Sequence, residues 1–378
     1  MMARLGEICL KITDGSHNPP AGGLKSDYLM LSSKNVYDDQ ITFDDPRYLS
    51  YEDFMNENKR TQIQEGDVLL TIVGTVGRTA VVPRLSTNIC LQRSVAVLRP
   101  NIDIISPRFL MYSLQNLRTQ IEKEAKGIAQ KGIYLKQVEN LQIKVLPLSE
   151  QNCIVKTLGT TDNLISLRKH QLAKLDELVK SRFIELFGDK GYSEDTLLNL
   201  CNIIDYRGKT PEKVDSGLPF ITAKNIKMHQ MNLEPREYIS KETYDKVMVR
   251  GFPKEGDVVF TTEAPLGNVC RIPHFDTEFY IGQRIVTLQT EKLEPIYLEY
   301  ALSSDDFKTK YMEKSSGSTV TGIRVRLLEQ LTIPVPPIDI QKQFADLVEQ
   351  TDKSKCEIQQ SLEKLETLKK ALMQKYFG

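Results

Sequence analysis

Apolar residues recur at alternating steps of three and four along two long stretches of the chain, 149–188 and 339–378. This heptad spacing is typical of helices that pack against other helices. The first stretch carries the pattern at Leu158, Thr161, Ile165, Arg168, Leu172, Leu175, Val179 and Arg182. The second carries it at Val348, Thr351, Lys355, Ile358, Leu362, Leu365, Lys369 and Leu372. Each stretch is therefore predicted to be one long helix of roughly 50 Å.

The residues at the ends of both stretches support this prediction. Ser149 and Asp339 suit the N-cap position, because a side-chain oxygen can accept a backbone N–H that has no partner inside the helix. Gly188 and Gly378 each follow a phenylalanine and suit the position after a helix, where glycine adopts the left-handed conformation at little cost. The two stretches therefore begin and end alike.

Polar positions within the two heptad patterns indicate what each helix packs against. Arg168 in the first stretch corresponds to apolar Ile358 in the second, and Lys355 corresponds to apolar Ile165. Pairing of identical helices would place charge against charge, so the two stretches are expected to pair with each other. The apolar residues expected to form this pairing are Leu158, Ile165, Leu172, Leu175, Val348, Ile358, Leu362 and Leu365. A core helix in an ordinary domain is the alternative, but such helices rarely run so long or recur with identical spacing.

The similarity between the two stretches extends over the rest of the chain at one constant offset, the one that separates Gly188 from Gly378. We call it the repeat offset. The matching segments are 28–36 with 218–226, Tyr48-Leu-Ser50 with Tyr238-Ile-Ser240, Gly66-Asp-Val68 with Gly256-Asp-Val258, Gly77 with Gly267, Gly127 with Gly317, and Gly132 with Gly322. Gln92-Arg93 matches Gln283-Arg284 after a shift of one residue. A period of this length indicates a duplicated domain. We predict a first domain (1–148), a central helix (149–188), a second domain (189–338) and a distal helix (339–378).

Short apolar runs between turn residues predict a mixed α/β fold for both domains. These strand candidates are Val68–Val73, Ala80–Pro83, Ser94–Leu98 and Leu141–Leu146 in the first domain, and Val258–Thr262, Val269–Pro273, Ile285–Gln289 and Leu331–Val335 in the second. Ser106-Pro107 begins a predicted helix, and Pro295 begins its counterpart. The apolar face of the first of these helices is formed by Leu110, Leu114, Leu117 and Ile121. The predicted fold class is α+β.

Charge and cysteine content limit the possible classes of protein. The chain has 50 Lys and Arg against 50 Asp and Glu, so its formal charge of zero does not indicate a strongly basic nucleic-acid binder. The six cysteines are far apart, which argues against a zinc site and a disulfide framework. No apolar signal region begins the chain and no apolar run approaches the length of a membrane span, so a soluble cytoplasmic protein is expected.

No arrangement of residues predicts a catalytic centre or a metal site. Gly208-Lys209-Thr210 resembles the end of a phosphate-binding loop, but Ile203 occupies the position of the earlier glycine. His17-Asn18-Pro19-Pro20 resembles the Asn-Pro-Pro-aromatic motif of amino-methyltransferases, but Ala21 replaces the aromatic residue that would stack on a flipped base. The four histidines have no metal-ligand spacing. We therefore predict no catalytic residue and no bound metal.

Polar residues at matching positions of the two copies are the candidate DNA contacts. Lysine and arginine can neutralise phosphates or bind guanine, and asparagine and glutamine can bind adenine in the major groove. Residues kept in both copies suit phosphate contacts or a structural role, whereas the change from Arg78 to Asn268 after a kept glycine suits base reading. The candidates are Lys34, Asn35, Arg78, Gln92, Arg93, Lys224, Asn225, Asn268, Gln283 and Arg284. A purely structural role is the alternative for the recurring pairs.

The order and duplication of these features resemble the specificity subunit of Type I restriction–modification systems. The resemblance covers essentially the whole chain. It is carried by the segment 66–78, by the segment 317–341 that ends in Ile-Pro-Val-Pro-Pro-Ile-Asp-Ile-Gln, and by the two helices that close in Phe-Gly. It implies two target-recognition domains, each mixed α/β, separated by two long antiparallel coiled-coil helices with approximate two-fold symmetry.

The same resemblance implies a function. Such subunits are not enzymes. They recognise a bipartite, asymmetric target in double-stranded DNA and position two adenine-methyltransferase subunits on it, and restriction subunits join the full complex. No cofactor is expected on this chain, and S-adenosylmethionine is expected on the partner methyltransferase subunit.

Two other classes of function remain open at this point. The chain could itself modify or cleave DNA, which methyl transfer or cleavage by the purified chain would reveal. It could also be a duplicated protein-interaction scaffold, which the absence of salt-sensitive DNA binding would favour.

Overall fold

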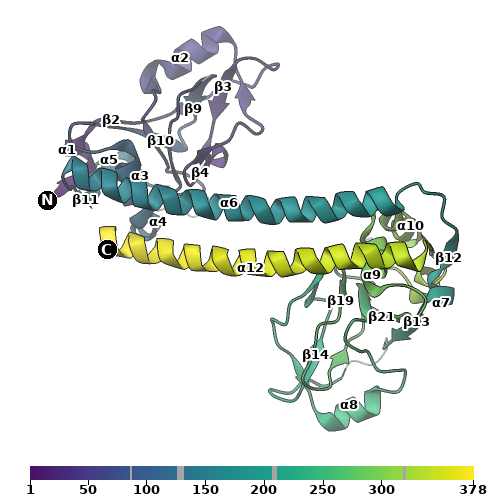
Figure 1. Ribbon diagram of the computed structural model, residues 1–378. Helices are drawn as coiled ribbons and strands as arrows, with labels where there is room; N and C mark the ends of the chain where they lie inside the picture. Colours follow the sequence, from purple (N-terminus) through teal and green to yellow (C-terminus); the bar gives the residue numbers. More distant parts are fainter. Residues whose placement is uncertain (86, 126–131, 207–210, 318–320) are drawn as a thin grey trace. The chain divides into compact units, whose positions relative to one another are not determined.

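The computed structural model describes residues 1–85, 87–125, 132–206, 211–317 and 321–378. Gly127 and Gly208-Lys209-Thr210, which the sequence singled out, lie outside these residues. The described chain divides into two compact units (Figure 1). Unit 1 consists of Met1–Lys169 and Gln360–Gly378, and unit 2 of His170–Gln359. Each unit includes part of both long helices, so the predicted boundaries between domains and helices stay a prediction.

Unit 1 is built from short strands and helices around a four-stranded sheet. Its strands are β1 (Met2–Arg4), β2 (Cys9–Asp14), β3 (Tyr28–Leu31), β4 (Val36–Tyr37), β5 (Gln40–Ile41), β6 (Arg47–Tyr48), β7 (Val68–Thr71), β8 (Thr79–Val81), β9 (Asn88–Leu91), β10 (Val95–Pro100) and β11 (Gln142–Lys144). Its helices are α1 (Leu5–Ile8), η1 (Ser33–Asn35), α2 (Tyr51–Thr61), α3 (Pro107–Asn116), α4 (Arg118–Glu124) and α5 (Leu135–Asn140), with parts of α6 (Leu148–Phe187) and α12 (Ile338–Phe377). The antiparallel four-stranded sheet has the order β2-β10-β7-β8, and a smaller sheet has the order β6-β3-β9.

Unit 2 repeats this plan. Its strands are β12 (Glu194–Thr196), β13 (Asn202–Asp205), β14 (Leu218–Ile221), β15 (Ile226–Lys227), β16 (Gln230–Met231), β17 (Tyr238–Ile239), β18 (Val258–Thr261), β19 (Val269–Arg271), β20 (Tyr280–Ile281), β21 (Ile285–Gln289) and β22 (Thr332–Pro334). Its shorter helices are α7 (Leu197–Leu200), α8 (Lys241–Val247), α9 (Pro295–Ser303), α10 (Asp305–Lys314) and α11 (Val325–Leu328). The sheet orders β13-β21-β18-β19 and β17-β14-β20 match those of unit 1. The duplicated mixed α/β fold is therefore confirmed.

The continuous apolar run of β7 follows from two cores, one on each face of the four-stranded sheet. Val68 and Leu70 pack into a core that includes Phe109 of α3. Leu69, between them, packs into a second core that includes Leu31 of the smaller sheet. Because neighbouring residues of a strand point to opposite faces, a strand covered on both sides is apolar throughout.

The predicted helix that begins at Ser106-Pro107 is in fact two helices. Leu117, with φ −82° and ψ 1°, separates α3 from α4. The break redirects the chain so that Arg118 Nε donates to Gly77 O at 3.0 Å while Ile121 stays buried. The apolar face that the sequence assigned to one helix is therefore shared by two.

The two long helices have nearly the bounds that the sequence predicts. α6 and α12 each begin one residue before the predicted cap residues Ser149 and Asp339. The left-handed residue after α6 is Asp189, with φ 43°, and not Gly188 as expected. A Cβ on Gly188 would lie 2.7 Å from the carbonyl oxygen of Ile184, so close approach, rather than a left-handed conformation, favours glycine there.

A buried glutamine in the first turn of each long helix fastens that helix to its domain. Gln151 accepts a hydrogen bond from the backbone N–H of Ser106 at 2.9 Å, just before α3. Gln341 accepts one from the backbone N–H of Glu294 at 2.9 Å, just before α9. Both amide groups also donate to backbone carbonyls, so neither buried side chain lacks partners. These glutamines place α3 and α9 against the same turn of their long helices.

Within each unit α6 and α12 run antiparallel. In unit 1, Asp162 lies 2.6 Å from Lys369 Nζ. Lys169, further along α6, lies 3.3 Å from Glu366, which precedes Lys369 in α12. Figure 1 shows α6 in teal beside α12 in yellow. The predicted pairing of the two long helices is therefore confirmed.

The burial of the long helices follows the predicted heptads. Every predicted seam position is buried or half-buried. The polar seam residue Lys355 meets Asp176 of α6 at 2.6 Å, so its charge has a partner on the facing helix. Four leucines outside the seam are exposed, namely Leu164, Leu167, Leu178 and Leu368.

Candidate nucleic-acid interface

Four loops of unit 1 meet at one end of the four-stranded sheet, and backbone hydrogen bonds hold them together. The N–H of Arg93 donates to Ser16 O at 2.8 Å, and the N–H of Ile72 donates to Ser94 O at 2.9 Å. The N–H of Ser33 donates to the hydroxyl of Ser94 at 3.1 Å. We call this arrangement loop cluster 1, and it consists of residues 14–17, 32–34, 72–78 and 92–94. It brings together the predicted contacts Lys34, Arg78, Gln92 and Arg93.

Unit 2 forms a corresponding arrangement, loop cluster 2, from residues 222–224, 262–268 and 282–284, which are the counterparts of three of the four loops of cluster 1. The N–H of Thr262 donates to Arg284 O at 2.8 Å. At the repeat offset, this bond corresponds to the one from Ile72 to Ser94 in unit 1. The register of β18 on β21 also equals that of β7 on β10 at the repeat offset. The one-residue shift that the sequence match suggested for Gln92-Arg93 is therefore wrong.

The corrected match places unlike side chains at equivalent positions. It pairs Gln92 with Gly282, Arg93 with Gln283, and Ser94 with Arg284. Arg93 and Arg284 are exposed, whereas Gln92 and Gln283 are half-buried. Arg284 has φ 81°, and its Nε lies 3.6 Å from Glu263. The two clusters thus share a backbone arrangement and differ in the groups that they present.

A buried threonine fixes the loop between β7 and β8. The hydroxyl of Thr71 donates to Thr75 O and accepts from the N–H of Arg78 at 2.9 Å. Thr261 makes the same two bonds at the equivalent positions of unit 2. Because both threonines are fully buried, they set the loop from inside and leave its tip, Gly74-Thr75, exposed.

The side chains of Arg78 and Asn268 turn toward the hairpin that follows η1 in unit 1 and its counterpart in unit 2. The guanidinium carbon of Arg78 lies 4.8 Å from the centre of the Tyr37 ring. Asn268 Nδ2 donates to Ile226 O at 2.8 Å. This bond uses one of the two amide N–H groups of Asn268, and base reading by that residue stays a prediction. Base reading by Arg78, stacked on an exposed tyrosine, stays a prediction.

Asn35 and Asn225 have a structural role, which contradicts their predicted DNA contacts. Each is only 1% exposed. Asn35 Oδ1 accepts from the N–H of Ser32 at 3.0 Å, and its Nδ2 donates to Asp44 O at 2.9 Å. Asn225 makes the same two kinds of bond in unit 2. A buried amide with both ends bonded closes a turn and has no free group for a phosphate or a base.

The neighbouring lysines point outward. Lys34 and Lys224 are both exposed. Lys34 forms an ion pair with the exposed carboxylate of Asp45, and its hydrogen bond and charge hold the pKa of that carboxyl below the ordinary value. Such a pair is screened by salt and easily exchanged for a phosphate. Phosphate contacts from these two lysines stay a prediction.

An arginine that the sequence reading missed lies beside loop cluster 1. The buried carboxylate of Asp14, at the end of β2, lies 2.7 Å from Arg60 Nη2 and 2.9 Å from His17 Nε2. The Arg60 side chain is half exposed. In unit 2 Arg250, which matches Arg60 at the repeat offset, donates to Asp205 O at 2.7 Å. This recurrence was the signal that could have identified both arginines as candidate phosphate contacts.

The part of the chain that the structure describes contains no group of three or more His, Cys, Asp or Glu side chains that could hold a metal ion. None of the helices within those residues is long and apolar enough to span a membrane.

Comparison with known proteins assigns the chain to a family. The family model for the Type I restriction modification DNA specificity domain matches twice, at residues 21–177 and 190–370. Two relatives from Methanocaldococcus jannaschii are similar over most of the chain. The putative type I restriction enzyme MjaX specificity subunit is 25% identical, with 80% of this chain and 77% of the relative covered. The type I restriction enzyme MjaVIII specificity subunit is also 25% identical, with 84% and 79% covered.

Solved structures share the fold over nearly the whole chain. The S subunit of a Type I restriction–modification system from M. genitalium has a TM-score of 0.64 at 14% identity, covering 100% of this chain and 96% of that one. A chain from a structural study of complex assembly and conformational transition of the type I R-M system has a TM-score of 0.56 at 20% identity, covering 99% and 96%.

The chain therefore belongs to the Type I restriction–modification DNA specificity family. Both halves match the family model, and the relatives are named specificity subunits. The resemblance seen in the sequence is confirmed, and so is the expectation of a non-catalytic chain, because the matched domain is a DNA specificity domain.

Substitution of two adjacent residues in η1 separates structural support from DNA contact. We expect Asn35→Ala to lower the free energy of unfolding by about 1–3 kcal/mol, because the buried amide that bonds the backbone of Ser32 and of Asp44 is lost. Lys34→Ala should change it by less than about 0.5 kcal/mol and should reduce the salt dependence of DNA binding by about one phosphate contact. Urea unfolding and binding titrations at several salt concentrations measure the two effects. Full stability of Asn35→Ala would contradict the structural role.

Proposed function

We propose that this specificity subunit reads a bipartite, asymmetric target in double-stranded DNA and positions two adenine-methyltransferase subunits on it, with restriction subunits joining the complex. S-adenosylmethionine would bind to the methyltransferase partner and not to this chain. The observation that carries the proposal is the pair of loop clusters. They share backbone hydrogen bonds at the repeat offset, among them Ile72 to Ser94 in cluster 1 and Thr262 to Arg284 in cluster 2, and they present different side chains.

The differences between the clusters support two unlike half-sites. Arg93 of cluster 1 is exposed where cluster 2 has Gln283, and Arg284 is exposed where cluster 1 has Ser94. Arginine favours guanine, and glutamine favours adenine, when either makes a bidentate contact in the major groove. Two readers with the same frame and different contacts would select different short sequences, which makes the combined target asymmetric.

The charge of the chain indicates that partners contribute to the affinity for DNA. Equal numbers of basic and acidic residues give no net attraction to the phosphate backbone. The exposed cations beside the clusters, Lys34, Arg60 and Lys224, can position a duplex locally. Tight binding is therefore proposed for the complex with the methyltransferases rather than for the chain alone.

Exposed leucines on the long helices support docking of two helical partners. Leu178 and Leu368, one in each unit and matched at the repeat offset, are 48% and 47% exposed. Both occupy the heptad position next to the seam, and Leu164 repeats that position in α6. An apolar stripe wider than the seam is typical of helices that belong to a larger bundle. Because the leucine recurs in both units, one methyltransferase subunit is proposed for each.

Domain exchange tests the assignment of one half-site to each domain. Residues 1–148 would be replaced by the corresponding domain of a relative with a different methylation target, and the product would be expressed with the same methyltransferase. We expect one half-site of the methylated sequence to change and the other to stay the same. A change in both half-sites, or in neither, would contradict the assignment.

Charged substitutions on the long helices test the docking of the partners. We expect Leu178→Lys and Leu368→Lys each to weaken the binding of one methyltransferase subunit at least about tenfold, because a lysine would be buried against an apolar partner surface. Native mass spectrometry would then show one bound methyltransferase in place of two. Ser181→Lys and Ala371→Lys add the same charge at other exposed positions of the same helices and should keep both. Loss of partners in the controls, or none in the leucine variants, would exclude this docking surface.

A further inference from the structure

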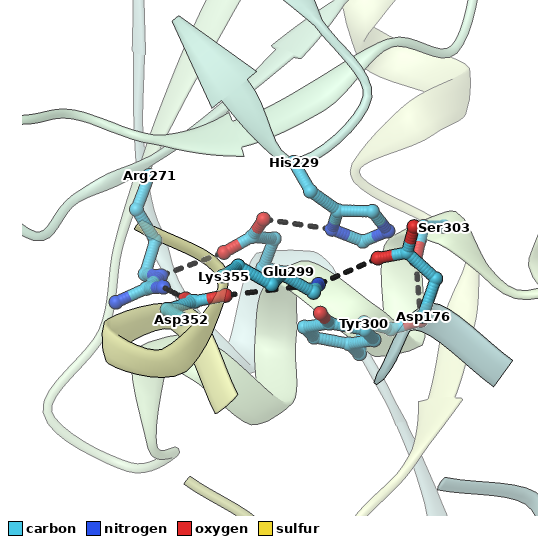
Figure 2. A network of polar contacts seen from close by, with 8 residues as sticks. All are labelled: Asp176, His229, Arg271, Glu299, Tyr300, Ser303, Asp352 and Lys355. Carbon is cyan, nitrogen blue, oxygen red and sulfur yellow. Dashed lines mark hydrogen bonds and ion pairs between the residues drawn. The ribbon is translucent and has the colours of Figure 1, made fainter. Parts of the chain in front are cut away.

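A buried glutamate in unit 2 gathers polar groups from the recognition domain. Glu299 of α9 is 2% exposed. Its carboxylate lies 2.8 Å from His229 Nδ1, in the turn between β15 and β16, and 2.7 Å from Arg271 Nε, at the end of β19. The His229 ring also stacks on Tyr300, with ring centres 4.3 Å apart. Figure 2 shows these side chains converging on Glu299.

The same network continues onto both long helices. Arg271 Nη2 lies 3.5 Å from Asp352 of α12. Lys355, one turn further along α12, lies 3.9 Å from Asp352 and 2.6 Å from Asp176 of α6 (Figure 2). A continuous set of charged contacts therefore joins the hairpin and sheet of the domain to the helix pair.

In unit 1, different residues connect the corresponding hairpin turn and the corresponding helix of the domain to the long helices. Asp39 corresponds to His229: both have φ 60°, and both donate their backbone N–H at 2.8 Å to the last strand of the four-stranded sheet in their own unit. Asp39 pairs with Arg108 of α3 at 2.8 Å. The contact with the long helix comes from Tyr112 of α3, whose hydroxyl donates to Asp162 at 2.8 Å.

The repeated aspartate is the common end point of both networks. Asp162 of α6 and Asp352 of α12 match at the repeat offset, and each receives a group from its own domain. Each is also close to a seam lysine of α12, Lys369 in unit 1 and Lys355 in unit 2. The charges at the hairpin turn are reversed between the units. In unit 1 Asp39 faces the cation of Arg108, and in unit 2 His229 faces the carboxylate of Glu299. The location of the contact is thus kept while its chemistry is not.

This location matters for the angle of each domain on its helices. Buried Leu158 and Val348 lie one turn before the two aspartates and pack into the domain cores. Apolar packing holds surfaces together without a strong directional preference, whereas hydrogen bonds and ion pairs need a set geometry. A polar contact about 6 Å further along the helix restricts rocking about the apolar contact.

Half-site spacing in DNA is sensitive to such rocking. One added base pair moves a half-site by about 3.4 Å and rotates it by about 35° around the duplex axis. A reader that rejects the wrong spacing must resist a turn of that size. In each unit, the apolar packing and the one polar network of that unit are the contacts that can oppose such a turn.

We propose that Glu299, Arg271 and Asp352 in unit 2, and Tyr112 and Asp162 in unit 1, are positioning residues that set the accepted spacing between the two half-sites. They do so by fixing the angle of each recognition domain on the helix pair, and they do not read bases. This inference rests on the proposed function, since it requires a split target.

The test is a methylation assay on a DNA library in which both half-sites are constant and the spacer varies in length, with the complete complex of this chain and its methyltransferase. We expect Asp352→Asn, Glu299→Gln and Tyr112→Phe to keep both half-site sequences. The preference for the native spacer over spacers one base pair longer or shorter should fall at least about threefold. Asp346→Asn, at an exposed position of α12, is the matched control and should keep the wild-type preference.

The outcomes separate this inference from the proposed function. A wild-type complex without a split motif would remove the proposed function itself. A wild-type complex with a sharp spacer preference, together with unchanged preferences in Asp352→Asn and Tyr112→Phe, would overturn the positioning role alone. Altered half-site sequences in these variants would also overturn it, because they would indicate base reading. If Glu299→Gln does not fold, Asp352→Asn and Tyr112→Phe decide whether the positioning role holds. They are milder, because they change a half-exposed carboxylate and a single phenol hydroxyl.

Discussion

The antiparallel pairing of α6 with α12 is the interaction on which the rest of the structure depends. Neither unit completes its core with residues that are continuous in sequence. The core of unit 1 contains Leu158 of α6 and packs against Phe377 at the far end of α12. The core of unit 2 takes Phe187 from the end of α6 and Phe344 from the start of α12. Each domain therefore folds onto a helix pair that both halves of the sequence must supply, and the lysines of the seam face aspartates across it, which favours this pairing over that of identical helices.

Because the domain is duplicated on this helix pair, residues that support the backbone can recur in both copies while residues that contact DNA differ. Residues that set the backbone recur unchanged, among them Thr71 and Thr261 inside the recognition loops and Gln151 and Gln341 at the start of the long helices. The exposed groups at the tips of the same loops do not recur. A specificity subunit needs this combination, because the geometry of the complex must stay constant while the two half-sites differ. The polar networks that end at the repeated aspartates share a property with each group. Their position recurs in both units, as it does for the supporting residues, but the residues that form them differ, as they do at the loop tips.

The sequence predicted the features that depend on long periodic patterns. The helices, the duplication and the central strands follow from apolar spacing over many residues, which survives local irregularity. The smaller sheets were missed because their strands, such as Arg47–Tyr48 and Tyr280–Ile281, are too short to show alternation. The candidate DNA contacts were less predictable. A dipeptide shared by chance suggested a shift that the hydrogen bonds exclude, and Asn35 proved to be buried in a turn, which no periodicity reveals. The contact between Asn268 and Ile226 joins segments far apart in the sequence and could be seen only in the folded chain.

On this proposal, two unlike recognition domains on one helix pair give a methyltransferase complex a split target. The most direct test is a methylation map of a methylation-free host that expresses this chain with its cognate methyltransferase, with the methyltransferase alone as control and N6-methyladenine located by long-read sequencing. We expect a split motif with two different half-sites, present only when this chain is expressed. No motif from a preparation shown to form the complex, or a motif with two identical half-sites, would contradict the proposal.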